Sequence, residues 1–250
     1  MLQHVKPYLS PVSIVLSDIE GEHLGTGSYC SVKSARFLVT NDHVAEHQQG
    51  KQLAHQFHES DSVAKLQNPF CGLGWPTDVA LSQIDDSVWN ICQHSGKAIP
   101  QDSFCELHLP VERELLFLVG FSGERSRFMF GTLISPGTPY LTQECQLPTE
   151  HVDPEKHFAL HYRPDLASSV EKNSFGLPDP HGFSGSLVWN TRRVECIQKN
   201  EEWSPELAKV TGIVWGWPSS DACLLATKVE HMQMSALAGK CLTIRSSGRP

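Results

Sequence analysis

The stretch "GTGSYCSVKSARFLVTNDHV", residues 25–44, holds two predicted strands followed by a polar cluster. Aromatic and β-branched residues favour extended structure over Tyr29–Lys33 and Arg36–Thr40. The second strand is apolar at its centre and leads directly into Asn41, Asp42 and His43. A rigid strand would therefore hold the His43 imidazole at the mouth of a β barrel.

Short strands bounded by glycine and proline recur along the rest of the chain, a pattern typical of an all-β barrel or sandwich. Only one segment has a helical composition: Val229–Ala238, which we expect to end at Gly239. The further predicted strands are Val12–Leu16, Gln52–Phe57, Asp78–Ile84, Leu115–Phe121, Arg127–Ile134, His157–Tyr162, Ser186–Trp189, Val210–Trp215 and Cys223–Val229. The turn signals are Gly25-Thr26-Gly27, Asn68-Pro69, Ser135-Pro136-Gly137 and Pro178-Asp179-Pro180.

Composition excludes several classes of function. The 250 residues carry a net charge of −8 with scattered basic residues, which argues against nucleic-acid binding. No apolar run is long enough to span a bilayer, and we recognise no signal peptide. We therefore predict a cytoplasmic protein whose eight cysteines are free thiols. Neither the cysteine spacing nor the pair His43 and His47 fits a zinc pattern, so we expect no metal or other cofactor.

The tetrapeptide "GFSG" occurs twice, at 120–123 and 182–185, and offers two candidate nucleophiles. Ser122 follows an apolar strand, as in the G-x-S-x-G elbow of α/β-hydrolases. However, Glu124 replaces the last glycine of that elbow, and strand-forming residues follow it. We therefore interpret Ser122 as part of a turn. A small-ester hydrolase using Ser122, Asp153 and His181 is kept as an alternative.

Ser184 lies between a proline-rich loop and the apolar run "SLVW". Gly182 allows its own N–H and that of Ser184 to converge on one point, which is what a developing oxyanion needs. A serine nucleophile also needs a base and a group that orients the base. His43 is the candidate base. Asp78 in "WPTDVALSQI" is the candidate orienting group, because a carboxylate at the edge of a core needs donors. The competing acids are Asp42, Asp85 and Asp86.

In the order His43, Asp78 and Ser184, these motifs resemble the trypsin/chymotrypsin-like serine proteases. The bacterial high-temperature-requirement type is the most similar. The stretch quoted first looks like that group's G-x-G strand, hairpin and T-N-x-H-V segment, and "TDVALSQI" looks like its T-D-[IVL]-A-[LV] segment. "GFSGS" matches G-x-S-G-[GS], and "KVTGIVWGW" resembles the strand that lines the substrate cleft.

The resemblance implies two six-stranded antiparallel β barrels with a short C-terminal helix. Residues 1–105 would carry His43 and Asp78, and residues 106–250 would carry Ser184. The implied oxyanion hole is formed by the amides of Gly182 and Ser184. The implied substrate-binding residues are Asp179, His181, Val214, Trp215 and Gly216, although Asp179 could equally be a solvated loop acid.

We therefore predict a serine endopeptidase that forms an acyl-enzyme and acts on a protein or peptide. The main alternative is a protease-fold protein that binds partners without cleaving them. We expect neither nucleic acid nor membrane among its partners. Phe183, before Ser184, cannot accept the charge of a freed N-terminus, so we expect no activation by N-terminal processing. If the protein is held inactive, we expect a mobile loop or a regulatory partner protein to do this.

Overall fold

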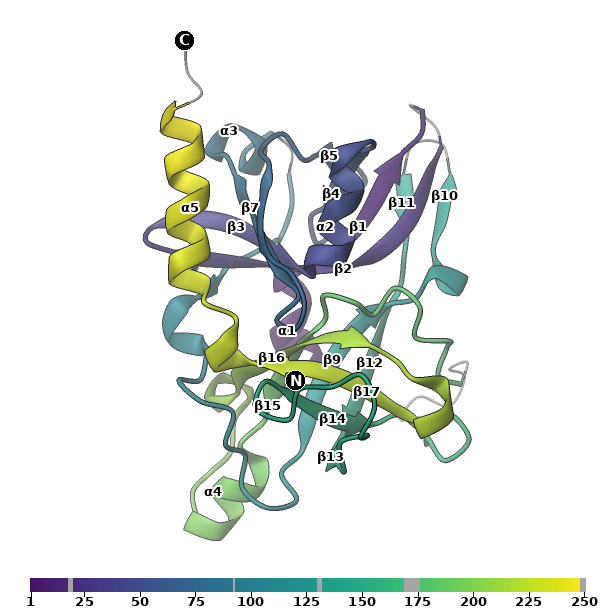
Figure 1. The fold of residues 1–250 in the computed structure, drawn as a ribbon, viewed down its shortest axis with the longest axis vertical. Coiled ribbons are helices and arrows are strands. Elements are labelled where there is room, and N and C mark those ends of the chain that lie inside the picture. Colours follow the sequence, from purple (N-terminus) through teal and green to yellow (C-terminus); the bar gives the residue numbers. More distant parts are fainter. Residues whose placement is uncertain (18–19, 92, 130–131, 169–175, 248–250) are drawn as a thin grey trace.

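A computed structural model of the protein describes residues 1–17, 20–91, 93–129, 132–168 and 176–247. Most described elements are strands, which confirms the all-β prediction. The strands form two large sheets that make up the upper and lower halves of the molecule in Figure 1.

The first sheet has eight strands in the order β5-β4-β1-β2-β3-β7-β6, with β8 paired to β2. These pairings are antiparallel except that of β8, which runs parallel to β2. The strands are β1 (Leu9–Val15), β2 (Gly21–Val32), β3 (Ala35–Thr40), β4 (Gln52–Gln56), β5 (Val63–Lys65), β6 (Phe70–Leu73), β7 (Val79–Ile84) and β8 (Ile99–Pro100).

The second sheet has seven strands in the order β12-β9-β15-β16-β17-β14-β13. They are β9 (Leu116–Phe121), β12 (Gly137–Thr142), β13 (Glu144–Cys145), β14 (His157–His161), β15 (Leu187–Asn190), β16 (Lys209–Gly216) and β17 (Cys223–Lys228). The described sheets thus differ from the expected six strands each, because short edge strands such as β5 and β13 extend them.

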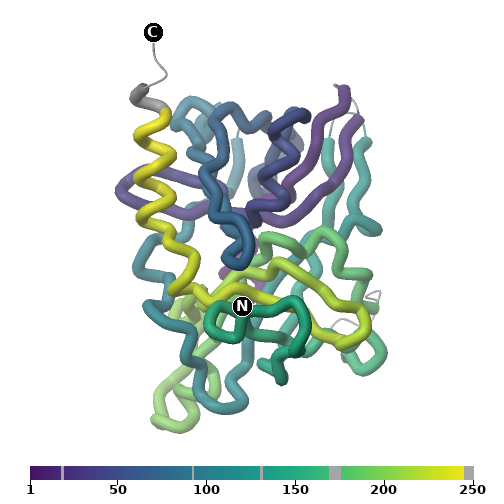
Figure 2. The backbone as a smooth tube through the Cα atoms, in the orientation of Figure 1, coloured from purple at the N-terminus to yellow at the C-terminus, as the bar shows by residue number. Residues whose placement is uncertain are grey.

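Two predicted elements differ in detail. Arg127–Ile134 was expected as one strand. Its described part forms the hairpin strands β10 (Arg127–Met129) and β11 (Thr132–Ile134), while residues 130–131 lie outside the described residues. Gly25-Thr26-Gly27 was expected as a turn but lies inside β2. Figure 2 shows the β10–β11 hairpin beside the β1–β2 hairpin at the upper right.

Short helices connect the strands: α1 (Leu2–Val5), α2 (Asp42–Ala45), α3 (Asp86–Trp89) and α4 (Arg193–Lys199). The long helix α5 spans Met234–Ser247, and Val229–His231 forms a separate 3₁₀ turn, η7. The predicted helix was therefore wrong at both ends. It continues through Gly239, because Leu237, Ala238 and Cys241 are buried in the core. The other 3₁₀ turns are η1 (Lys6–Tyr8), η2 (Glu46–Gln49), η3 (Gln101–Ser103), η4 (Gly123–Arg125), η5 (Pro205–Leu207) and η6 (Ser219–Asp221).

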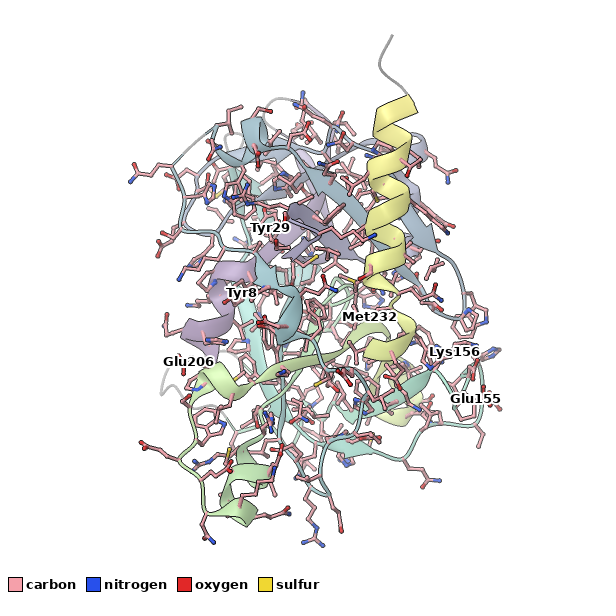
Figure 3. All side chains as sticks on the ribbon, turned by 90° about the vertical axis from the view of Figure 1, so that its left-hand side faces the viewer. Tyr8, Tyr29, Glu155, Lys156, Glu206 and Met232 are labelled. Atoms are coloured by element: carbon pink, nitrogen blue, oxygen red, sulfur yellow. The ribbon has the colours of Figure 1, made fainter. Side chains whose placement is uncertain are left out.

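One buried cluster joins the two halves. It contains Val39 and Leu81 of the first sheet together with Val119 and Leu187 of the second. Met232, just before α5, belongs to the same cluster and lies at the level where the halves meet (Figure 3). Burying apolar surface across this joint fixes the loops that extend from both sheets toward it.

Candidate functional site

His43 and Asp78 are joined by two hydrogen bonds. The Nδ1 atom of His43 lies 2.6 Å from Oδ2 of Asp78, and the His43 backbone N–H donates to Oδ1 at 2.9 Å. The Asp78 side chain is 10% exposed and that of His43 is 48% exposed. The carboxylate therefore fixes the imidazole through Nδ1 and leaves the outer part of the ring open to solvent.

Asp78 adopts an unusual backbone conformation, with φ of 52° in the left-handed region. Asparagine and aspartate tolerate this region better than other side chains, although it still costs energy. The neighbouring Asn41 donates from Nδ2 to the Asp78 carbonyl at 2.6 Å, and Asn41 is fully buried. Asn41 is the residue before α2 and His43 is the second residue of α2. The short segment after β3 therefore holds both the backbone carbonyl and the carboxylate of Asp78.

Asp42, the first of the competing acids, faces another direction. A Cβ atom on Gly72 would collide with its carboxylate, so the Asp42 side chain lies over strand β6. Burial, reinforced by the negative charge of Asp78, raises the pKa of Asp42. Asp85 and Asp86 lie at the start of α3, where Asp86 pairs with Arg36. Among the four acids, Asp78 is the one that contacts His43 in the described structure.

The Ser184 loop of the second half lies next to this pair. A Cβ atom on Gly25 would lie 3.1 Å from both the Ser184 carbonyl and a methyl group of Val44, the residue after His43. The Thr26 N–H donates to the same carbonyl at 2.8 Å. The fold therefore brings the backbone of Ser184 close to the start of α2.

The hydroxyl of Ser184 makes no hydrogen bond to another described residue, and the side chain is only partly buried. Hydrogen bonds between a nucleophile and its base are often long in unliganded sites and tighten when substrate binds. Within the described part of the chain, the backbone N–H groups of Gly182 and Ser184 likewise have no backbone acceptor. These are the groups that an oxyanion would need.

The two GFSG tetrapeptides pack against each other. The ring of Phe183 lies on Gly120, the Ser122 hydroxyl donates to the Asp179 carbonyl at 2.9 Å, and Gly123 N–H donates to the His181 carbonyl at 2.9 Å. Ser122 is 0% exposed. The first tetrapeptide therefore supports the loop of the second, and its serine is buried in a structural contact.

Asp179 and His181 interact with each other. The Asp179 carboxylate accepts from the His181 backbone N–H at 2.9 Å and also contacts Nδ1 of its ring. Burial alone would raise the pKa of Asp179, but these hydrogen bonds outweigh it and the pKa is lowered. Both side chains are largely exposed, at 42% and 80%. Asp179 is therefore a solvent-exposed residue whose carboxylate accepts the backbone N–H two residues later in the same loop.

The remaining predicted substrate-binding residues lie on β16. Val214 is buried in the core, whereas Trp215 and Gly216 are partly exposed. Pairing with β17 is irregular between Val214 and Gly216, and such a bulge redirects the side chain between them. The Trp215 ring accordingly packs edge-on against Trp75, at a centroid distance of 5.1 Å.

Trp75 and His157 were not predicted as part of this region. Trp75 is 59% exposed, and His157 packs against both tryptophan rings. The His157 Nε2 atom lies 2.6 Å from the Pro76 carbonyl, so this contact ties the loop before Asp78 to the second sheet. An isolated tryptophan beside a proline gives no sequence signal for such a contact, which depends on two distant segments.

No protein-family model matches the chain, and no curated protein matches it in sequence. Solved structures do match its fold. The apo protease domain of MamO from Magnetospirillum magneticum is 11% identical, with 100% of both chains covered and a TM-score of 0.50. A catalytically active tobacco etch virus protease in complex with product is 12% identical, with 96% of this chain and 80% of that chain covered and a TM-score of 0.49. The chain therefore has a chymotrypsin-like protease fold.

Proposed function

We propose that the protein is a serine endopeptidase in which Ser184 attacks the peptide carbonyl, His43 acts as general base and Asp78 orients His43. The observation that carries this proposal is the pair of hydrogen bonds that His43 donates to the carboxylate of Asp78, whose backbone is left-handed. Strained backbone at a buried carboxylate is a feature that clusters at active sites. The fold is compatible with this activity.

The chemistry follows from these positions. Asp78 accepts a hydrogen bond from the Nδ1–H of His43, which keeps the proton on Nδ1 and leaves Nε2 free to take the proton from the Ser184 hydroxyl. The oxygen of Ser184 then bonds to the carbonyl carbon. The amides of Gly182 and Ser184 stabilise the negative charge on the carbonyl oxygen. His43 returns its proton to the leaving amine, and water repeats the sequence on the acyl-enzyme.

The motif resemblance to the bacterial high-temperature-requirement type supports the same assignment. We further propose a protein or peptide substrate and a reducing, cytoplasmic location. Every described cysteine is a free thiol, and no described helix has the length and apolar character to cross a bilayer. Control by a regulatory protein stays part of this proposal. The alternative based on Ser122 is disfavoured, because its hydroxyl is buried and already bonded to Asp179.

The test combines a fluorophosphonate probe with hydrolysis of fluorescein-labelled casein. Peptide mapping should locate the probe on Ser184. Ser184→Ala and His43→Ala should each lower kcat by on the order of 10⁶-fold if the three groups act as a unit. Ser87→Ala changes an exposed serine of α3 and is the matched control. A wild type that is folded yet neither labelled nor active would favour the non-cleaving binding protein.

A further inference from the structure

We propose that Thr26, in strand β2 of the first sheet, is a positioning residue that holds the Gly182 amide in the orientation an oxyanion requires. This inference rests on the proposed function and adds a role for a residue of the opposite sheet. Thr26 is 0% exposed, so its hydroxyl must find its partners inside the protein.

The Thr26 side chain bridges two segments of the second half. Its Oγ1 donates to the Gly182 carbonyl at 2.8 Å and accepts from the Phe121 N–H at 3.0 Å. Its backbone N–H donates to the Ser184 carbonyl at 2.8 Å. One residue therefore holds the carbonyls on both sides of Phe183.

These contacts determine where the Gly182 N–H points. The His181 carbonyl is held by Gly123, and in a trans peptide the N–H of the next residue points the opposite way. The Gly182 carbonyl, one peptide further on, is held by Thr26. Both peptides that flank the Gly182 Cα are thus fixed, and its N–H is left free of a described backbone acceptor.

Gly182 needs such an external restraint. Its φ of 98° lies in a region open to glycine, whose backbone rotates more freely than that of other residues. The His23 ring adds a second restraint: a Cβ atom on Gly182 would lie 2.7 Å from Nε2 of His23. That Nε2 is 2.8 Å from the Phe121 carbonyl. Thr26 is itself held by the Thr40 hydroxyl, which donates to its carbonyl at 2.8 Å.

The experiment compares Thr26→Val, which removes the hydroxyl but keeps the branched shape, with Thr26→Ser, which keeps the hydroxyl. Thr142→Val is the matched control, because the Thr142 hydroxyl is also buried and donates to a backbone carbonyl, that of His161, at 2.7 Å. The measurements are kcat and KM on labelled casein, the rate of fluorophosphonate labelling, and crystal structures of the variants.

Removing one oxyanion donor lowers kcat by about 10²–10³-fold, and misdirecting it should approach the lower end of that range. We therefore expect Thr26→Val to lower kcat by about 10²-fold with little change in KM, and Thr26→Ser to restore most of it. The crystal structure of Thr26→Val should show a reoriented Gly182 amide.

Equal kcat in Thr26→Val and Thr142→Val, with an unchanged Gly182 amide, would overturn the role of Thr26 while leaving the proposed function intact. If the wild type itself fails to cleave casein or react with the probe, the proposed function fails. The orientation of Gly182 in the Thr26→Val and Thr26→Ser crystals then still decides whether Thr26 sets it.

Discussion

The aromatic ring of Phe183 rests directly on Gly120, with no space for a side chain between them. A Cβ atom on Gly120 would lie within 2.7 Å of the ring carbon Cδ2. The two residues belong to the two copies of the same tetrapeptide. The first copy therefore acts as a platform, and the geometry of the Ser184 loop depends on the absence of a side chain at Gly120.

Gly120→Ala should destabilise the protein and weaken its activity together. Overpacking of a well-packed site typically costs about 1–3 kcal/mol. Gly120→Ala should cost less in a Phe183→Ala background, because that change removes Cγ, Cδ1 and Cδ2, the ring atoms that the added Cβ would meet. Urea unfolding of the single and double variants measures the coupling. Gly50→Ala is the control and should have little effect, because a Cβ added at Gly50 would have no atom of another residue outside its chain neighbours within 4 Å. Purely additive effects of the two changes would contradict the platform.

Asp78→Asn should leave the fold intact but lower kcat by about 10⁴-fold, because an amide favours the wrong tautomer of His43. Circular dichroism checks the fold, and casein hydrolysis gives kcat. Asp86→Asn, which only breaks an exposed ion pair with Arg36, should retain full activity. Near-normal turnover in Asp78→Asn would point to another acid, and Asp42→Asn is then the next variant to measure.

Thr227→Val should loosen the segment that carries Asp78. The Thr227 hydroxyl donates to the Thr77 carbonyl at 2.8 Å, and both residues are buried. Leaving this carbonyl unpaired should lower the free energy of unfolding by about 1–3 kcal/mol. Hydrogen exchange measured by mass spectrometry should show faster exchange over residues 74–79. Unchanged exchange there, despite a lower global stability, would mean that the contact does not restrain Asp78.

The free energy of unfolding should fall as the pH drops below about 6.5, the pKa of an unfolded histidine. Burial lowers the pKa of His55 to about 3, and its Nδ1 lies 2.7 Å from the Tyr29 hydroxyl. Between these two values the unfolded state binds a proton that the folded state does not, so stability rises with pH. One such group contributes a slope of up to about 1.4 kcal/mol per pH unit.

His55→Gln should reduce this slope, measured by urea unfolding between about pH 4 and about pH 6.5, inside the window between the two pKa values. His151→Gln, at an exposed histidine, serves as the control and should leave the slope as it is. Burial also lowers the pKa of His23 and His157, so part of the slope should persist in His55→Gln. An identical slope in His55→Gln and the wild type would show that His55 titrates normally.

The sequence was informative where local chemistry and position coincide. Neither His43 nor Asp78 stands out alone, but their motifs in the order His43, Asp78 and Ser184 resemble the serine proteases, and the structure places His43 and Asp78 in contact. The supporting residues could not be found this way. Thr26 lies between two glycines and was interpreted as a turn, but its pairing with Pro11 of strand β1 makes it part of β2.

The helix near the C-terminus shows the same limit. Gly239 is a common stop signal and its presence costs about 1 kcal/mol within a helix. However, a Cβ at this glycine would meet only the Lys33 Nζ atom, at 3.4 Å, so nothing there requires a glycine conformation. Burial of Leu237 and Cys241 on either side favours continued helix. Tertiary packing therefore determines where α5 ends, and the local sequence pattern does not indicate it.

The few hydrogen bonds that Thr26, His23 and Thr227 make to the opposite half have a consequence for behaviour on warming. Opening this seam by a fraction of an ångström would separate the serine loop from the imidazole while each half keeps its own sheet. Such partial opening requires less free energy than global unfolding. The proposed turnover should therefore be lost reversibly several degrees below the melting temperature, while both sheets are still folded.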